Sequence, residues 1–273
     1  VNNCENRIIA RVASLVIIPS LKRHLHPEQK GFIPGRLGSD HIEQLTEEFY
    51  SRAAGLTPGR DSHILSIDSR KAFDSISVPF LHAVLDRIGL PSWLGTLVKG
   101  LYERARVTPI FGTEPTDVWI DLQRGVRQGC PLSPLLFAIV MDPLVEQLRV
   151  LPGVRCFAFA DDLAFSARYL HQLTPVMHLI DAFTEVSGLG INTDKTSVTS
   201  TGDPQSLRDW IKLFSPWQDL QVTPSFTYLG VLVGAAVTTA QVFEGAMEKF
   251  RKRVRAYYPI TRAMSVQKRI HLP

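Results

Sequence analysis

The chain has 273 residues, of which 45% are hydrophobic and 21% are charged, so it can bury a large core and is not disordered. Its three cysteines, Cys4, Cys130 and Cys156, are odd in number and widely spaced. They indicate neither a disulfide framework nor a zinc module, and they favour a reducing compartment.

The net charge of +4 is unevenly distributed along the chain. Residues 249–269 contain eight basic residues and no acid follows Glu248, which leaves 22 basic against 26 acidic residues elsewhere. The basic end predicts contact with a polyanion, and a solvated helix face is the alternative. No signal-peptide pattern opens the chain, and the apolar run 220–243 is interrupted by Pro224, so we expect an intracellular protein without a membrane segment.

Hydrophobic periodicity and turn residues predict helices and strands in irregular alternation. In the first half, chain order gives a helix over 7–25, a Gly/Pro-rich loop over 31–40, a helix from Ser39 or Asp40 to about 54, a strand over 63–68, helices over 77–89 and 91–103, and a hairpin of 106–112 with 116–122.

The second half continues with a helix over 131–148, a hairpin over 154–167, a helix over 171–188, a hairpin over 225–234 and an amphipathic helix from 243 onward. Because adjacent strands form hairpins, the order favours an α+β fold with an antiparallel sheet over a doubly wound parallel sheet.

Three aspartates lie in or at the end of apolar strands. Asp68 ends the segment HILSID, and Asp161 and Asp162 are adjacent within FADDLAF. Buried neighbouring carboxylates repel each other, and a divalent cation removes that repulsion. Oxygen ligands without histidine or cysteine favour Mg²⁺, and two such ions catalyse phosphoryl transfer. Taken alone, however, the Asp-Asp pair is also typical of a polar hairpin turn.

Six segments in order carry a resemblance to a known family. Five resemble the palm motifs of reverse transcriptases, in the style of non-LTR (LINE-type) retrotransposon enzymes: SIDSRKAFDSI (66–76), GVRQGCPLSPLLF (125–137), FADDLAF (159–165), GLGINTDKTSV (188–198) and YLGVLVG (228–234). A sixth, QKGFIPGR (29–36), resembles their fingers motif.

The resemblance implies a right-hand polymerase fold with a palm built on an antiparallel sheet, helical fingers and the beginning of a helical thumb. We expect incomplete N-terminal fingers over 1–60, a palm over 61–235 with a fingers insertion at about 78–118, and the start of a thumb over 236–273. The family's RPI-like stretch would precede Val1, so we interpret the sequence as a polymerase-domain fragment that need not be active alone.

The resemblance also implies a set of site residues. Asp68, Asp161 and Asp162 match the catalytic metal ligands, with the backbone carbonyl of Ser69 as a further ligand for two Mg²⁺ ions, which Mn²⁺ could replace. Four other positions match nucleotide-handling or catalytic residues: the steric-gate aromatic Phe73, the loop residues Gln128 and Gly129, and the pyrophosphate-side lysine Lys195. The structural alternatives are core packing for Phe73, a helix-entry loop for Gln128 and Gly129, and a solvated surface lysine for Lys195.

The implied partners are an RNA template, a DNA primer and a dNTP, with no membrane. The primer-grip hairpin would be Tyr228, Leu229 and Gly230, and the first thumb helix would offer Arg251, Lys252 and Arg255 to the duplex. Arg36, together with Lys30, would contact template phosphate. A nuclear location is expected if the element is eukaryotic.

Two other functions share this pattern of acids. An RNA-dependent RNA polymerase must accept a 2′-hydroxyl, and Phe73 argues against it. A catalytically inactive scaffold that binds nucleic acid is the second alternative, and the retention of all three aspartates argues against it.

Overall fold

The computed structural model describes residues 4–54, 61–102, 105–112 and 114–263. Its centre is a five-stranded sheet in the order β11-β10-β1-β8-β7. These strands are β1 (His63–Ile67), β7 (Val154–Phe159), β8 (Asp162–Ala167), β10 (Ser197–Ser200) and β11 (Gln221–Val222). All pairs are antiparallel except β10 with β11, so the predicted antiparallel sheet is confirmed apart from one parallel pair at its edge.

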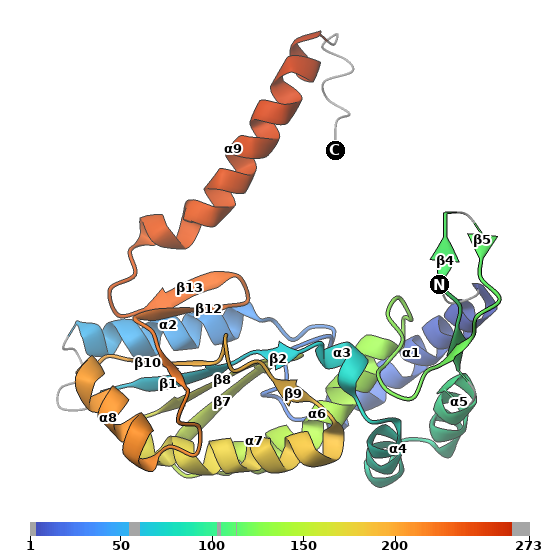
Figure 1. The fold of residues 1–273 in the computed structure, drawn as a ribbon, viewed down its shortest axis with the longest axis horizontal. Coiled ribbons are helices and arrows are strands. Elements are labelled where there is room, and N and C mark those ends of the chain that lie inside the picture. Colours follow the sequence, from blue (N-terminus) through green and yellow to red (C-terminus); the bar gives the residue numbers. More distant parts are fainter. Residues whose placement is uncertain (1–3, 55–60, 103–104, 113, 264–273) are drawn as a thin grey trace.

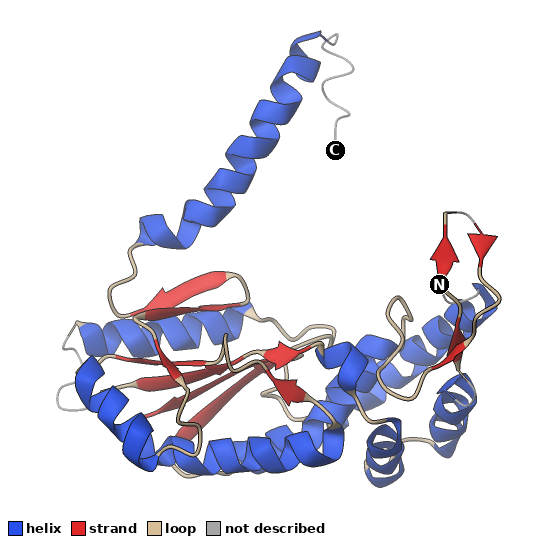
Figure 2. Cartoon of the chain, in the orientation of Figure 1, coloured by secondary structure: helices blue, strands red, loops and turns tan. Residues whose placement is uncertain are grey.

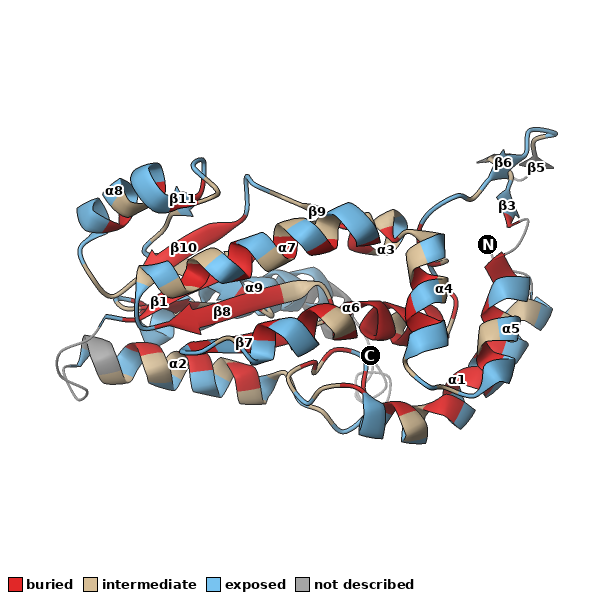
Figure 3. Ribbon diagram, turned by 90° about the horizontal axis from the view of Figure 1, so that it is seen from below, coloured by how far each residue is buried: buried red, intermediate tan, exposed pale blue. Residues whose placement is uncertain are grey.

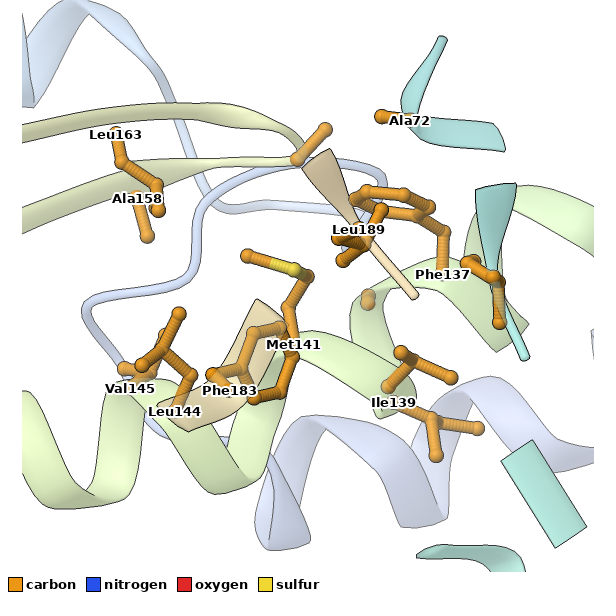
Figure 4. Packing of buried hydrophobic residues seen from close by; sticks show 14 of the residues in the cluster. Ala72, Phe137, Ile139, Met141, Leu144, Val145, Ala158, Leu163, Phe183 and Leu189 are labelled. Carbon is orange, nitrogen blue, oxygen red and sulfur yellow. The ribbon is translucent and has the colours of Figure 1, made fainter. Parts of the chain in front are cut away.

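Alternate residues of the central strands enter two hydrophobic cores, one on each face of the sheet. Leu65 and Phe165 pack with helices α6 (Ser133–Arg149) and α7 (Leu173–Ser187) in the larger core, whereas Ile64 and Ala164 belong to the smaller one. This alternation follows from the period of two in a strand. Figure 3 shows the buried central strands, and Figure 4 shows Leu163, Phe137 and Met141 among the side chains of the larger core.

The smaller core lies beneath α2 (Ser39–Ala53) and the hairpin β12 (Ser225–Tyr228) and β13 (Val231–Gly234), which Figure 1 shows on the side of the sheet opposite α7. Leu45 and Phe49 of α2 and Phe226 of β12 are buried there. The helix and the hairpin predicted for these segments are both confirmed.

The predicted helix ends agree with local chemistry. Helix α4 (Val78–Arg87) begins after Ser77, whose hydroxyl accepts from the N–H of Phe80 at 3.4 Å, and Gly89 follows it at φ 72°. Helix α7 ends at Gly188, which has φ 77°. Helix α1 (Cys4–His24) and α5 (Ser92–Tyr102) also lie where the periodicity predicted them.

Two parts extend from the compact centre (Figures 1 and 2). One is a ribbon in which β3 (Arg106–Val107) pairs with β6 (Ile120–Asp121), and β4 (Ile110–Phe111) pairs with β5 (Glu114–Pro115). The other is α9 (Thr239–Ala263), whose predicted apolar face, including Phe243 and Phe250, is exposed. Residues 1–3, 55–60 and 264–273, to which the expected fingers and thumb extend in sequence, lie outside the described residues.

Several elements were not predicted from the sequence, among them the sheet strand β10. Others are β2 (Ser69–Arg70), α3 (Ala72–Ser75), the 3-10 helix η1 (Leu170–Gln172), β9 (Gly190–Ile191) and α8 (Pro204–Phe214). A usable signal existed for α8, because Asp203 caps it by accepting from the N–H of Ser206 at 2.8 Å and Pro204 is its first residue. Within the described ranges, no helix has both the length and the hydropathy of a membrane-spanning segment.

Candidate active site

Strand register brings the three aspartates to one end of the sheet. Asp68 directly follows β1, Asp162 is the first residue of β8, and Ile67 pairs with Leu163, so Asp68 and Asp162 are neighbours across two adjacent strands. Asp161 occupies the turn between β7 and β8, where Phe159 pairs with Asp162. The predicted hairpin with acids at its tip is therefore confirmed.

Electrostatics show that these carboxylates lie within reach of each other's charge. Burial raises the pKa of Asp161, and the charge of Asp68 raises it further. Burial also raises the pKa of Asp162, followed by the charges of Asp161 and Asp68. Both causes disfavour ionisation, and a nearby cation would counter both of them.

The carboxylate of Asp68 is held from the segment that carries Lys195. Asn192 donates from Nδ2 to Asp68 Oδ2 at 2.9 Å, and Lys195 Nζ lies 3.8 Å from the same oxygen. The backbone carbonyl of Asp68 also accepts from the N–H of Asn192 at 2.8 Å. Sequence reasoning missed Asn192, although it lies in the same motif, three residues before Lys195.

The donor set fits a hard divalent cation, since it consists of three carboxylates, with Lys195 near that of Asp68, and such cations prefer oxygen ligands. Among the residues that the structure describes, no three His, Cys, Asp or Glu side chains converge closely enough to form a ready-made metal cluster. The engagement of Asp68 with Asn192 and Lys195 is consistent with this. Ser69, the other predicted ligand, begins β2 beside Asp68 and pairs with Ile191.

Phe73 lies in α3 and is packed as well as partly exposed. Its ring stacks on the fully buried Phe137 at 4.6 Å between centroids, and the edge of Phe32 approaches at 5.8 Å. One face of the ring therefore contributes to the core, while the side chain as a whole is half-buried.

The predicted nucleotide loop is attached to α3. Gly125 donates its N–H to the carbonyl of Ile76, and Val126 donates to that of Phe73, both at 2.7 Å. Gln128 is exposed and donates to Asp74 Oδ1 at 2.8 Å. Gly129 has φ 78°, with open space where a Cβ would lie. Phe73, Gln128 and Gly129 are thus connected through one short stretch of backbone.

The predicted primer-grip residues form the turn of the β12–β13 hairpin. Leu229 and Gly230 have φ values of 50° and 79°. Leu229 packs against the smaller core, as does Phe159, which precedes the turn that carries Asp161. Tyr228 is buried, and its hydroxyl lies 3.1 Å from His41 Nδ1. Burial raises the pKa of Tyr228 and lowers that of His41 to about 4, so both side chains are neutral at pH 7.

The geometry gives Arg36 a structural role. Its guanidinium donates to four backbone carbonyls, those of Lys22, Leu25, His26 and Gln29, at 2.5 to 3.1 Å. These bonds hold the end of α1 to the loop that follows it, and the template contact of Arg36 stays a prediction.

The remaining predicted cations differ in exposure. Lys30 is partly buried and pairs with Asp40 at 3.0 Å. Arg251, Lys252 and Arg255 are exposed on α9, which Figure 1 shows directed away from the sheet, so they are available to a partner.

Comparison with known proteins identifies the family. A family described as reverse transcriptase (RNA-dependent DNA polymerase) matches residues 1–233. The chain belongs to the reverse transcriptase family. Its resemblance to non-LTR enzymes is confirmed by relatives from R2 elements, which are 29% identical in Popillia japonica and 28% in Drosophila melanogaster and cover 65% and 72% of this chain.

A protein of transposon TX1 from Xenopus laevis is 29% identical over 85% of this chain. The chain spans only 26%, 18% and 19% of the Popillia, Xenopus and Drosophila relatives. Telomerases from Candida albicans and Candida tropicalis share the fold, with TM-scores of 0.55 and 0.58 at 15% and 12% identity over 87% and 83% of this chain and 37% and 43% of theirs. The right-hand polymerase-like α+β fold is thereby confirmed.

Proposed function

We propose that this chain is the polymerase part of a retroelement reverse transcriptase, which extends a DNA primer on an RNA template. The observation that carries the proposal is the meeting of Asp68, Asp161 and Asp162 at one end of the sheet in a chain of this family. In this proposal residues 1–60 belong to the fingers, 61–235 to the palm with a fingers insertion at about 78–118, and 236–273 to the thumb.

The three carboxylates and the carbonyl of Ser69 would hold Mg²⁺, or Mn²⁺ in its place. When bound, two such ions would activate the primer 3′-hydroxyl and stabilise charge on the reacting phosphate and the leaving oxygen. The apolar strands on both sides of the acidic turn hold Asp161 and Asp162 at the sheet end, and Asn192 orients Asp68.

Lys195 supplies positive charge on the Asp68 side of the site. Its ammonium group is mostly exposed and lies within 3.8 Å of Asp68, so it can move toward a leaving pyrophosphate. There it would stabilise negative charge or donate a proton. Gln128 would hydrogen-bond to the sugar or base, and Gly129 allows the backbone to approach the nucleotide.

Phe73 would exclude ribonucleotides. Its stacking on Phe137 fixes the ring, so a 2′-hydroxyl would meet a side chain that cannot move aside. Tyr228, Leu229 and Gly230 would hold the primer end beside the acidic turn, and the exposed basic residues of α9 would follow the duplex backbone.

Primer extension by the full chain on an RNA template with Mg²⁺ tests the proposal. Asp161→Asn is expected to abolish extension while duplex binding stays unchanged. The matched control is Asp117→Asn, which makes the same change at an exposed position of the β-ribbon. If wild type and Asp161→Asn were equally inactive and both bound duplex, the chain would be a nucleic-acid-binding scaffold instead.

The nucleotide choice separates a DNA polymerase from an RNA polymerase. Phe73→Ala is expected to raise incorporation of rNTP relative to dNTP by about tenfold or more. The smaller side chain leaves room for the 2′-hydroxyl, and a change of one group in a binding pocket typically alters discrimination by this factor. Phe80→Ala is the control. Phe80, on α4, is also half-buried, and its ring packs edge-on against that of Phe183 with 5.6 Å between centroids. Equal use of rNTP and dNTP by the wild type would remove the steric gate and favour an RNA polymerase.

A further inference from the structure

Residues 28–30 add to the edge of β7 next to the acidic turn of Ala160 and Asp161. The Gly/Pro-rich loop over 31–40 that follows them is called the fingers loop. Gln29 forms a parallel bridge with Ala158. Lys30 donates its N–H to the carbonyl of Ala158 at 2.8 Å, and Ala158 donates its own to the carbonyl of Glu28 at 3.3 Å. Residues 28–30 therefore act as a short extra strand beside β7, 131 positions away in sequence from the turn they support.

The side chain of Gln29 is fully buried, and its amide hydrogen-bonds to both backbone groups of one residue of that turn, Ala160. Its Oε1 accepts from the N–H of Ala160 at 2.9 Å and from the N–H of Gly31 at 2.8 Å. Its Nε2 donates to the carbonyl of Ala160 at 3.4 Å. A buried amide is favourable only when it is hydrogen-bonded, and here all of its partners lie around Ala160 and the adjoining loop.

Ala160 is the residue in need of such support. It has φ 56° at the first central position of a two-residue hairpin turn, where glycine is normally favoured. A residue with a Cβ costs about 1–2 kcal/mol in this conformation and persists there only when its surroundings hold it. The next two residues are Asp161 and Asp162, so the conformation of Ala160 determines where both carboxylates point.

Gly31 contacts Ala160 from the fingers loop. This contact and the hydrogen bonds of Gln29 together form what is called the clamp on Ala160. A Cβ at Gly31 would lie 2.2 Å from the backbone N of Ala160 and 2.9 Å from its Cα. Real Cβ atoms do not approach backbone this closely, so only glycine allows the loop to lie against the turn. The distance between the fingers loop and the acidic turn is thus fixed by contact as well as by hydrogen bonds.

We propose that Gln29 is a positioning residue, whose amide holds Ala160 in its positive-φ conformation and thereby directs Asp161 and Asp162 toward the divalent ion. This inference rests on the proposed function, because it assumes that the two carboxylates hold a metal. Groups that hold metal ligands in place alter metal affinity or activity by about 10–100-fold when they are removed.

The test compares two glutamines with the same chemistry at opposite ends of β8. Gln172 Oε1 also accepts from two backbone N–H groups, those of Arg168 and Tyr169 at 3.2 and 3.1 Å, but beyond the other end of the strand. Methionine approximates the length of glutamine, has no N–H to donate, and its thioether sulfur is only a weak acceptor. Gln29→Met is expected to weaken Mn²⁺ binding by about tenfold or more, whereas Gln172→Met should leave it unchanged.

Mn²⁺ binding to the full chain is followed by electron paramagnetic resonance, which does not require a competent polymerase. In primer extension, Gln29→Met should lower kcat with an unchanged Kd for the duplex, and Gln29→Glu, which keeps an accepting oxygen, should restore most of the Mn²⁺ affinity. Wild-type affinity in a folded Gln29→Met variant, or an equal loss in Gln172→Met, would overturn the positioning role.

Hydrogen exchange of the wild type gives a result that depends on no variant. The Ala160 amide should exchange as slowly as the amides paired between β7 and β8, and exchange at the rate of an exposed loop would contradict the clamp. Failure of the proposed function looks different: wild-type chain would then bind no Mn²⁺ and extend no primer, while the Ala160 amide would still be protected.

Discussion

The acidic turn and the neighbouring β12–β13 turn are built alike but differ in what they carry. Each is a two-residue turn that places a non-glycine residue at positive φ, Ala160 in one and Leu229 in the other. Each is also approached closely by the fingers loop, through Gly31 and Gly38. The first turn then presents two carboxylates of raised pKa, whereas the second presents only backbone and an apolar side chain.

A two-residue turn with a non-glycine residue at positive φ therefore serves a different purpose in each region. The acidic turn fixes charge, so changes around it should alter the rate of chemistry and its ion dependence. The β12–β13 turn would position the primer end, and the α9 helix that follows it would offer positive charge to the phosphate backbone of the duplex. Changes there should therefore alter the affinity for duplex. We therefore expect substitutions in the two regions to separate into effects on kcat and effects on Kd.

After the loss of extension expected for Asp161→Asn, the largest effect should come from Lys195→Ala in the acidic region. Removal of a group that stabilises charge or donates a proton is expected to lower kcat by about 100-fold, with little change in the affinity for duplex. Single-turnover extension measures it.

Lys99→Ala is a closely matched control for this prediction. Lys99 Nζ lies 3.8 Å from Asp86 Oδ2, the same separation as between Lys195 and Asp68, and all four side chains are partly or largely exposed. Exposed pairs of this kind contribute little to stability. An equal loss of kcat in both variants would return Lys195 to the role of a solvated surface lysine.

The next effect should be on binding, in the region of α9. Neutralising Arg251, Lys252 and Arg255 together should weaken duplex binding by about tenfold and reduce the slope of log Kd against log salt by roughly 3. Titration of labelled duplex at several salt concentrations measures both quantities, and kcat at saturating duplex should change little.

The control for α9 changes the same number of exposed basic residues on other helices, namely Arg149, Arg208 and Lys212. Its salt slope should equal that of the wild type. A slope that falls equally in both triple variants would show a diffuse effect of net charge, and the basic face of α9 would then be a solvated helix face.

A smaller effect is expected from Gly230→Ala in the β12–β13 turn. With φ 79° and open space around the missing Cβ, the substitution strains the backbone without a clash, which costs about 1–2 kcal/mol. Gly89→Ala at φ 72°, also in open space, should cost about as much stability. Only Gly230→Ala should also weaken primer binding, and equal duplex affinities in the two variants would contradict the primer-grip role.

Local pattern was sufficient for most of the longer elements and for the acids, but not for the contacts that hold them. The period of the β7 and β8 strands predicts the hairpin, and the ordered motifs point to Asp68 as the partner of its acids. The amide of Gln29 reaches Ala160 across 131 positions, and Asn192 reaches Asp68 across 124. No periodicity within one segment encodes such contacts, and the four carbonyls around Arg36 were missed for the same reason.

The smallest effect concerns stability in the absence of divalent ions. Burial and the charge of Asp68 raise the pKa of Asp161, so the folded chain binds this proton more tightly than the unfolded chain does. The resulting penalty is full above the raised pKa and disappears as the pH falls below the ordinary value of about 4. Asp161→Asn should therefore raise Tm at pH 7 by on the order of 2 °C, and this gain should narrow toward pH 4.

Scanning calorimetry across pH with a chelator present measures this gain, and Asp117→Asn should show none. Adding Mg²⁺ should then raise the Tm of the wild type more than that of Asp161→Asn, because binding to the folded state stabilises it in proportion to affinity. A lower Tm for Asp161→Asn at pH 7, or a gain independent of pH, would mean that the ionised carboxylate already has a compensating partner within the chain. The acidic turn would then resemble the β12–β13 turn, as a structural feature whose strain serves shape alone.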